Sequence, residues 1–237
     1  MHPLSNTAFN QEPHAPLDSG RVHIGIRYTL SYMKSQLRIP LHTSPEQAAR
    51  LQALQTVFAQ ACNSIAPLVQ QTGIWNRVAL HHLAYKALRA KYPAIGSQMA
   101  CNVIYSVSRA SRLIYQHPSS PFHVSRLGGK ALPLLHFTNA APVYFDRHTL
   151  SLKDGQLSMF TLDGRMRFQL ALQTQDEARF HHQKLHEIVL ARRSDGAFEL
   201  CFLFSPKTTA KKNQRNPALT DTTTDELPDY VTVEEQT

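Results

Sequence analysis

Apolar residues recur at every third or fourth position through residues 44–116, which is the spacing of one face of an α-helix. The first predicted helix begins with a capping box. Ser44 caps it, Pro45 takes the first helical position and the Gln47 side chain reaches back. The helix ends before Gly73, which closes it. Its apolar stripe consists of Leu51, Leu54, Phe58, Ala61, Ile65 and Leu68.

Two further amphipathic helices are expected. Asn76 caps the second, which Pro93 stops, and the third begins at Ser97. The predicted inner face of the second helix consists of Leu80, Leu83, Ala84, Ala87 and Leu88. Three such helices in a row predict a small helical bundle over residues 44–117.

The segments on either side of the helices alternate apolar and polar residues, which is the two-residue period of a β-strand. Before the helices, Leu37, Ile39 and Leu41 alternate in this way. After them, three Asp-Gly pairs lie between alternating segments and predict tight hairpin turns. These pairs are Asp154-Gly155, Asp163-Gly164 and Asp195-Gly196. We therefore predict an α+β fold: a small antiparallel β-barrel with the three helices inserted after its first strand.

This pattern divides the chain into segments of different character. The expected order is a disordered leader (1–20), the first part of the barrel (21–43), the helical lobe (44–117), a loop (118–133), the remainder of the barrel (134–206) and a disordered acidic tail (207–237).

The distribution of charge along the sequence indicates a polyanionic partner. All 25 Lys and Arg precede residue 217, together with 11 of the 17 Asp and Glu, so residues 1–216 carry a formal net charge of +14. The six acids that follow give the tail −6. Nucleic acid is the commonest partner of so basic a body, and lysines and arginines that simply face water are the alternative.

Other classes of protein are disfavoured. No apolar run approaches the roughly 18 residues of a membrane span, and the first 20 residues lack the apolar core of a signal peptide. Cys62, Cys101 and Cys201 are far apart within apolar patterns, as expected of buried thiols. The histidines show no four-ligand spacing, so we expect no metal or other cofactor. We expect a cytoplasmic protein.

The order of these features resembles the N-terminal half of the TnpB family, which are transposon-encoded RNA-guided nucleases long described as transposases. The matching stretches, in order, are LRIPLHTSPEQAARL, AQACNSI, WNRVALHHLAYKALRAKYPAIGSQMA and VYFDRHTLSLKDGQLSMFTLDGRMRFQL. The resemblance implies that the barrel is a wedge domain and that the helices form a recognition lobe. Together these would bind a structured guide RNA and double-stranded DNA.

The resemblance ends where the family's RuvC-like, ribonuclease-H-like nuclease domain would begin. After Pro206 there is no buried strand bearing an Asp and no Cys-x-x-Cys, although two-metal cleavage needs several carboxylates around the metal ions. We therefore expect no catalytic residues and no enzymatic activity of this chain alone.

Three groups of side chains are candidates for contact with nucleic acid. One edge of the third helix carries amides, a ring and guanidiniums, suited to base edges, stacking and phosphates. The second helix and the hairpins carry exposed cations suited to phosphates. The candidates are Lys86, Arg89, Gln98, Asn102, Tyr105, Arg109, Arg112, Arg165 and Arg167. An ordinary solvated helix face is the alternative for the first group, and simple exposure to solvent is the alternative for the cations of the second helix.

Three functions remain open from the sequence. The chain is a TnpB-like nucleic-acid-binding protein without its nuclease, a non-functional remnant of a decayed transposase gene, or the N-terminal half of a split nuclease whose other half is encoded separately.

Overall fold

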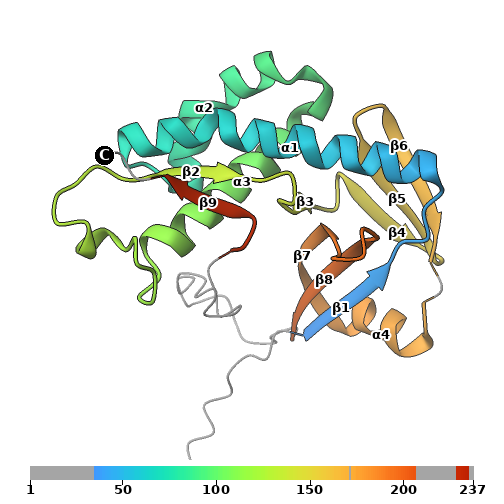
Figure 1. Ribbon diagram of the computed structural model, residues 1–237. Coiled ribbons are helices and arrows are strands. Elements are labelled where there is room, and N and C mark those ends of the chain that lie inside the picture. The colour runs from blue at the N-terminus through green and yellow to red at the C-terminus, as the bar shows by residue number, and fades with distance from the viewer. Residues whose placement is uncertain (1–34, 171, 207–227, 235–237) are drawn as a thin grey trace, which may run out of the picture. The chain divides into compact units, whose positions relative to one another are not determined.

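The computed structural model describes residues 35–170, 172–206 and 228–234, and the description below is confined to them (Figure 1). The fold is α+β, as predicted. Its α-helices are α1 (Pro45–Thr72), α2 (Arg77–Lys91), α3 (Gly96–Tyr115) and α4 (Thr174–His182), with short 3-10 turns η1 (Pro93–Ile95) and η2 (Val124–Arg126). None of these helices combines the length and the apolar content needed to cross a membrane.

The beginning and end of α1 confirm the prediction from local sequence. The Ser44 hydroxyl accepts a hydrogen bond from the Gln47 amide at 3.2 Å, and the Gln47 side chain accepts one from the Ser44 amide at 2.9 Å. At the other end Gly73 has φ 65°, the left-handed conformation of a helix C-cap. α2 begins at the Asn76 cap, as predicted.

The strands form three antiparallel sheets. They are β1 (Ser35–Pro40), β2 (Leu134–Phe137), β3 (Val143–Phe145), β4 (Leu150–Lys153), β5 (Gln156–Thr161), β6 (Gly164–Gln169), β7 (Gln183–Arg192), β8 (Phe198–Pro206) and β9 (Val231–Glu234). The sheet orders are β1-β8-β7-β3, β4-β5-β6 and β2-β9.

The predicted closed β-barrel is wrong, because none of the three sheets closes on itself. Closure requires the first and last strands of a sheet to pair, and in the largest sheet β1 and β3 are separate edges. The expectation that β1 shares a sheet with the later hairpins holds for β7 and β8. It fails for β4, β5 and β6, which form a sheet of their own.

The predicted disordered tail over 207–237 is wrong for residues 231–234. These residues form β9, which pairs antiparallel with β2 so that Phe137 faces Val231. Val231 and Val233 alternate with polar residues, a two-residue period too short to stand out in a polar segment. The expected leader, the first part of 21–43 and most of the tail lie outside the described residues.

One hydrophobic core joins the helices to the sheets. α1 crosses from β5 to β2 and buries its predicted stripe except for Leu68, which is half-buried, and Phe58 is fully enclosed (Figure 1). Burial raises the pKa of the Cys62 thiol to about 12, so this residue serves as a small apolar side chain. On α2, the predicted inner residues Leu83 and Ala87 are exposed. The helix is buried only along the row Leu80, Ala84 and Leu88, which packs against α3.

The first hairpin turn gives a testable prediction about stability. Asp154 and Gly155 both have positive φ, and a Cβ at residue 155 would lie 3.2 Å from the Leu170 backbone carbonyl oxygen and 2.9 Å from the side-chain nitrogen of Gln169. Gly155→Ala is therefore expected to lower the free energy of unfolding by about 2 kcal/mol. Gly128→Ala is the control, because its φ is also positive and its surroundings are open. A denaturant titration in which both variants lose equal stability would show that the close approach contributes nothing.

Candidate nucleic-acid interface

The candidate edge of α3 faces the protein and not the solvent. Met99 and its neighbours pack into the helical core, so the adjacent edge of α3 lies against β3 and β7. The side-chain amide of Asn102 donates to the Tyr144 carbonyl at 3.0 Å, and the Gln98 amide donates to the Asp146 carboxylate. The predicted solvated helix face, the alternative for this group, is thereby excluded for the two amides.

A polar network holds the middle of this edge. The Tyr105 hydroxyl donates to Glu187 Oε1, and Arg109 Nε lies 3.9 Å from the same oxygen. Arg109 Nη1 also donates to the Tyr144 hydroxyl at 3.3 Å. Burial holds the pKa of Tyr144 well above its ordinary value, so the phenol stays neutral. The network therefore joins α3 to both strands through one partly buried charge pair.

A β-bulge positions Glu187 in this network. The pairing of β7 with β8 shifts between Leu185 and Glu187, which leaves His186 as the extra residue. After the bulge, Glu187 pairs with Leu203 on the face that meets α3. Bulges re-aim side chains next to functional sites. Sequence reasoning missed Glu187. The buried Ile188 beside it places Glu187 on the opposite face of β7, but no sequence pattern shows that α3 covers that face.

A cavity of about 240 Å³ lies beside this network, between the start of α2, α3 and the strands β3 and β7. The polar residues of its lining are Arg77, Asn102, Tyr105, Arg112, Tyr144, Asp146, His186 and Glu187. Three of the predicted residues, Asn102, Tyr105 and Arg112, are thus brought together. Arg77, which the sequence reasoning did not select, completes the lining because α2 begins where α3 passes it.

A larger hollow of about 720 Å³ lies over the other part of the same sheet face, bordered by Tyr230 near the C-terminus. Three of its arginines, Arg38, Arg109 and Arg193, are paired with acids, and the fourth, Arg192, donates to the Gly196 carbonyl at 3.2 Å. Arg38 lies 2.8 Å from Glu199, and Arg193 lies 3.0 Å from Asp195. Since three of these four charges are balanced within the protein, this hollow offers a phosphate less than its arginine content suggests.

The predicted cations of α2 lie on its outer side. Lys86 is exposed, and Arg89 is partly exposed with its guanidinium donating to the Pro93 carbonyl at 3.2 Å. They are available to solvent on the helix surface, remote from the cavity lining, and their contact with nucleic acid stays a prediction.

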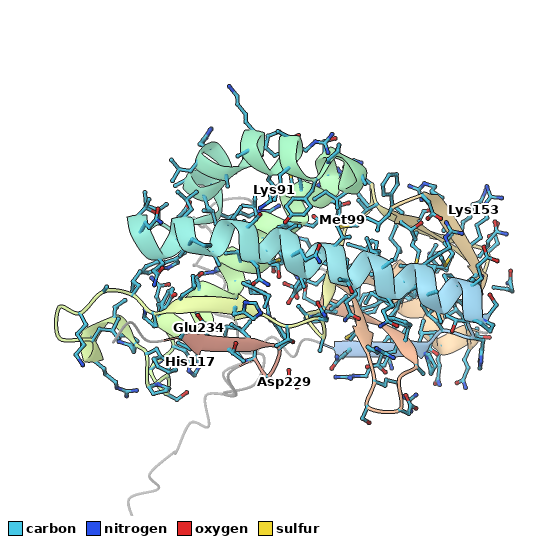
Figure 2. All side chains as sticks on the ribbon, turned by 45° about the horizontal axis from the view of Figure 1, so that its top comes forward. Lys91, Met99, His117, Lys153, Asp229 and Glu234 are labelled. Atoms are coloured by element: carbon cyan, nitrogen blue, oxygen red, sulfur yellow. The ribbon has the colours of Figure 1, made fainter. Side chains whose placement is uncertain are left out.

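The sheet β4-β5-β6 presents a mostly polar outer face to solvent. Its inner face is apolar, with Leu157, Met159 and Phe168 buried. The strand register places the following residues on the outer face: Ser151, Lys153, Gln156, Ser158, Phe160, Arg165, Arg167 and Gln169. We call this set the β4–β6 outer face. Lys153 lies at its β4–β5 end, on the far side of the protein from Glu234 of β9 (Figure 2).

The two arginines of the β4–β6 outer face are exposed and have no ion pair among the described residues. Arg165 lies along the sheet and donates to the Ser158 carbonyl at 3.2 Å and the His148 carbonyl at 2.9 Å. The nearest acid in the β5–β6 turn, Asp163, is bound by Arg50 at 2.7 Å, and this hydrogen bond lowers its pKa. Arg165 and Arg167 therefore give the outer face positive charge that no ion pair with a described residue balances.

Exposed Arg147 adds to this charge, since it precedes the His148 carbonyl to which Arg165 donates. Sequence reasoning missed it because it lies in a turn and outside any periodic segment. No cluster of three His, Cys, Asp or Glu suited to a metal ion occurs within residues 35–170, 172–206 and 228–234.

Comparison with known proteins does not extend these observations. No family model matches the chain, and no curated protein is significantly similar to it in sequence. The resemblance to the TnpB family and the roles it implies stay predictions.

Proposed function

We propose that this chain is a TnpB-like nucleic-acid-binding protein that holds a structured guide RNA and double-stranded DNA without cutting either. In this proposal the β-sheets act as the wedge domain, and α1, α2 and α3 act as the recognition lobe. A separately encoded nuclease domain is a further proposed partner, and the proposed location is the cytoplasm.

One observation carries the proposal: an exposed sheet face whose arginines have no acidic partner among the described residues. Arg165 is already held in place by hydrogen bonds to backbone carbonyls, so contact with a phosphate costs little side-chain entropy. The formal charge of +14 on residues 1–216 supports the same reading. Contacts of this kind bind the phosphates of a nucleic-acid strand and do not recognise its base sequence.

The test is the salt dependence of binding to a structured RNA hairpin, measured by filter binding between 50 and 200 mM salt. Each phosphate contact contributes roughly 0.7–0.9 to the slope of log K against log salt. The double variant Arg165→Ala/Arg167→Ala is expected to reduce that slope by about 2. Lys130→Ala, in an exposed loop, is the matched control.

Binding that does not change with salt would contradict the proposal and favour a non-functional remnant. An equal loss of slope in the control and the double variant would show diffuse attraction with no particular face. RNA cleavage or DNA cleavage that appears only when a second polypeptide is added would favour the split-nuclease alternative.

A further inference from the structure

The cavity beside α3 contains hydrogen-bond donors that have no acceptor within the described residues. Arg112 Nε is buried and makes no hydrogen bond. Neither Arg112 nor Arg77 forms an ion pair with a described residue, although both line the cavity. A buried donor on a charged group that lacks an acceptor is costly, and such exceptions call for an explanation. Nε itself is inaccessible, so a ligand in the cavity would accept hydrogen bonds from the other guanidinium nitrogens of Arg112 and from Arg77.

The same cavity contains an acceptor. Glu187 uses Oε1 for Tyr105 and Arg109, and no hydrogen bond reaches its Oε2 from the described residues. Asp146 differs, because Oδ1 accepts from the His148 amide at 3.0 Å and Oδ2 accepts from Gln98. The acceptor left for a ligand is therefore on Glu187.

An aromatic surface adjoins these polar groups. The Arg77 guanidinium carbon lies 5.1 Å from the centre of the Tyr105 ring, and the Tyr105 ring packs edge-on against Tyr144 at 5.3 Å. Guanidinium planes and aromatic rings are the surfaces on which unpaired bases stack. The lining of the cavity thus combines a flat contact surface with hydrogen-bond donors and an acceptor.

This combination discriminates between ligand classes. A phosphate would be repelled by Glu187 and Asp146, and a metal ion would be repelled by Arg77 and Arg112. Guanine carries both the hydrogen-bond acceptors that the arginines need and the hydrogen-bond donors that Glu187 needs. Its O6 and N7 accept from a guanidinium, and its adjacent N–H groups donate to a carboxylate. A volume of about 240 Å³ suits one base and excludes a base pair.

We infer that this cavity binds the guanine base of a single unpaired nucleotide. The inference rests on the proposed nucleic-acid function and adds to it a site that takes a base out of the strand. Arg112 binds the acceptor edge, Glu187 binds the donor edge, and the Arg77 guanidinium, which lies over the Tyr105 ring, provides the stacking surface.

The test uses the full chain with mononucleotides in isothermal titration calorimetry. GMP is expected to bind about tenfold more tightly than AMP, CMP or UMP, with ribose 5-phosphate as the probe for phosphate alone. Arg112→Met, which keeps the buried stem, is expected to weaken GMP binding about tenfold. Glu187→Gln is expected to abolish the preference for GMP over AMP. Lys130→Ala should bind GMP like the wild type.

Arg77→Ala keeps the inference testable if the buried variants do not fold, since Arg77 is exposed, and it too should weaken GMP binding. Equal binding of all four nucleotides, or binding of ribose 5-phosphate as tight as that of GMP, would overturn the inference. So would the absence of GMP binding. If RNA binding then still depends on salt, only the base site fails. If GMP binds but RNA binding ignores salt, the proposed function fails and the cavity remains a nucleotide site.

Discussion

Asn63→Ala is expected to lower the free energy of unfolding by about 3 kcal/mol, because Asn63 closes one edge of β2. Its side-chain amide donates to the Phe137 carbonyl at 2.9 Å, and its side-chain oxygen accepts from the Phe137 amide at 2.7 Å. β2 pairs only with β9 among the described strands, so its other edge must find partners elsewhere. Removing both hydrogen bonds leaves two backbone groups next to the core unsatisfied, at about 1–3 kcal/mol each.

Urea titration of the purified variant measures this loss. Gln60→Ala is the matched control. It removes an exposed amide from the same helix, and we expect no loss of stability because alanine is the better helix former. Equal stability of the Asn63 variant and the wild type would mean that solvent reaches Phe137 and satisfies its backbone groups.

Glu187→Ala is expected to lower the free energy of unfolding by about 2 kcal/mol, because it removes the carboxylate that lies 3.9 Å from Arg109 Nε. Breaking a fully buried charge pair costs about 3–5 kcal/mol. The lower figure applies here because the Arg109 and Glu187 side chains retain 12% and 19% of their exposure. The Tyr105 hydroxyl would lose its acceptor in the same variant.

A double-mutant cycle separates the charge pair from the loss of packing. In the Glu187→Ala background, Arg109→Met should cost at least about 1 kcal/mol less than it costs alone. Glu187→Gln is the control for the hydrogen bond, since its amide oxygen can still accept from Tyr105 while the charge is gone. Strict additivity of the two single variants would contradict an interaction between Arg109 and Glu187.

The pairing of β9 with β2 means that the effect of the acidic tail on RNA binding should be tested by substitution and not by truncation. Removing residues 217–237 would delete β9 together with the tail acids, and with it the pairing partner of β2. Substituting Asp221, Asp225 and Glu226 by amides removes charge outside β9 and keeps the strand. Tighter RNA binding by that variant is the outcome expected if the tail competes with phosphates.

The sequence by itself determined the elements whose formation depends on neighbouring residues. The start of α1 could be predicted because Ser44 and Gln47 lie three residues apart and satisfy each other's backbone. The turn at Asp154-Gly155 could be predicted because positive φ is a local property of those two residues. Alternating apolar residues likewise marked strands such as β5 and β6, since each of these buries one face.

Only the tertiary structure decided how the elements meet. Sheet closure depends on whether distant edges pair, and no local pattern shows that β1 and β3 remain apart. The sequence placed Gln98, Asn102, Tyr105 and Arg109 on one edge of α3 but did not show what that edge contacts. It faces β3 and β7 because the apolar stripe next to it is already committed to the helical core, so the polar atoms find partners in the sheet. Partner choice is a property of the whole packed chain, whereas helix and turn formation are properties of a few consecutive residues.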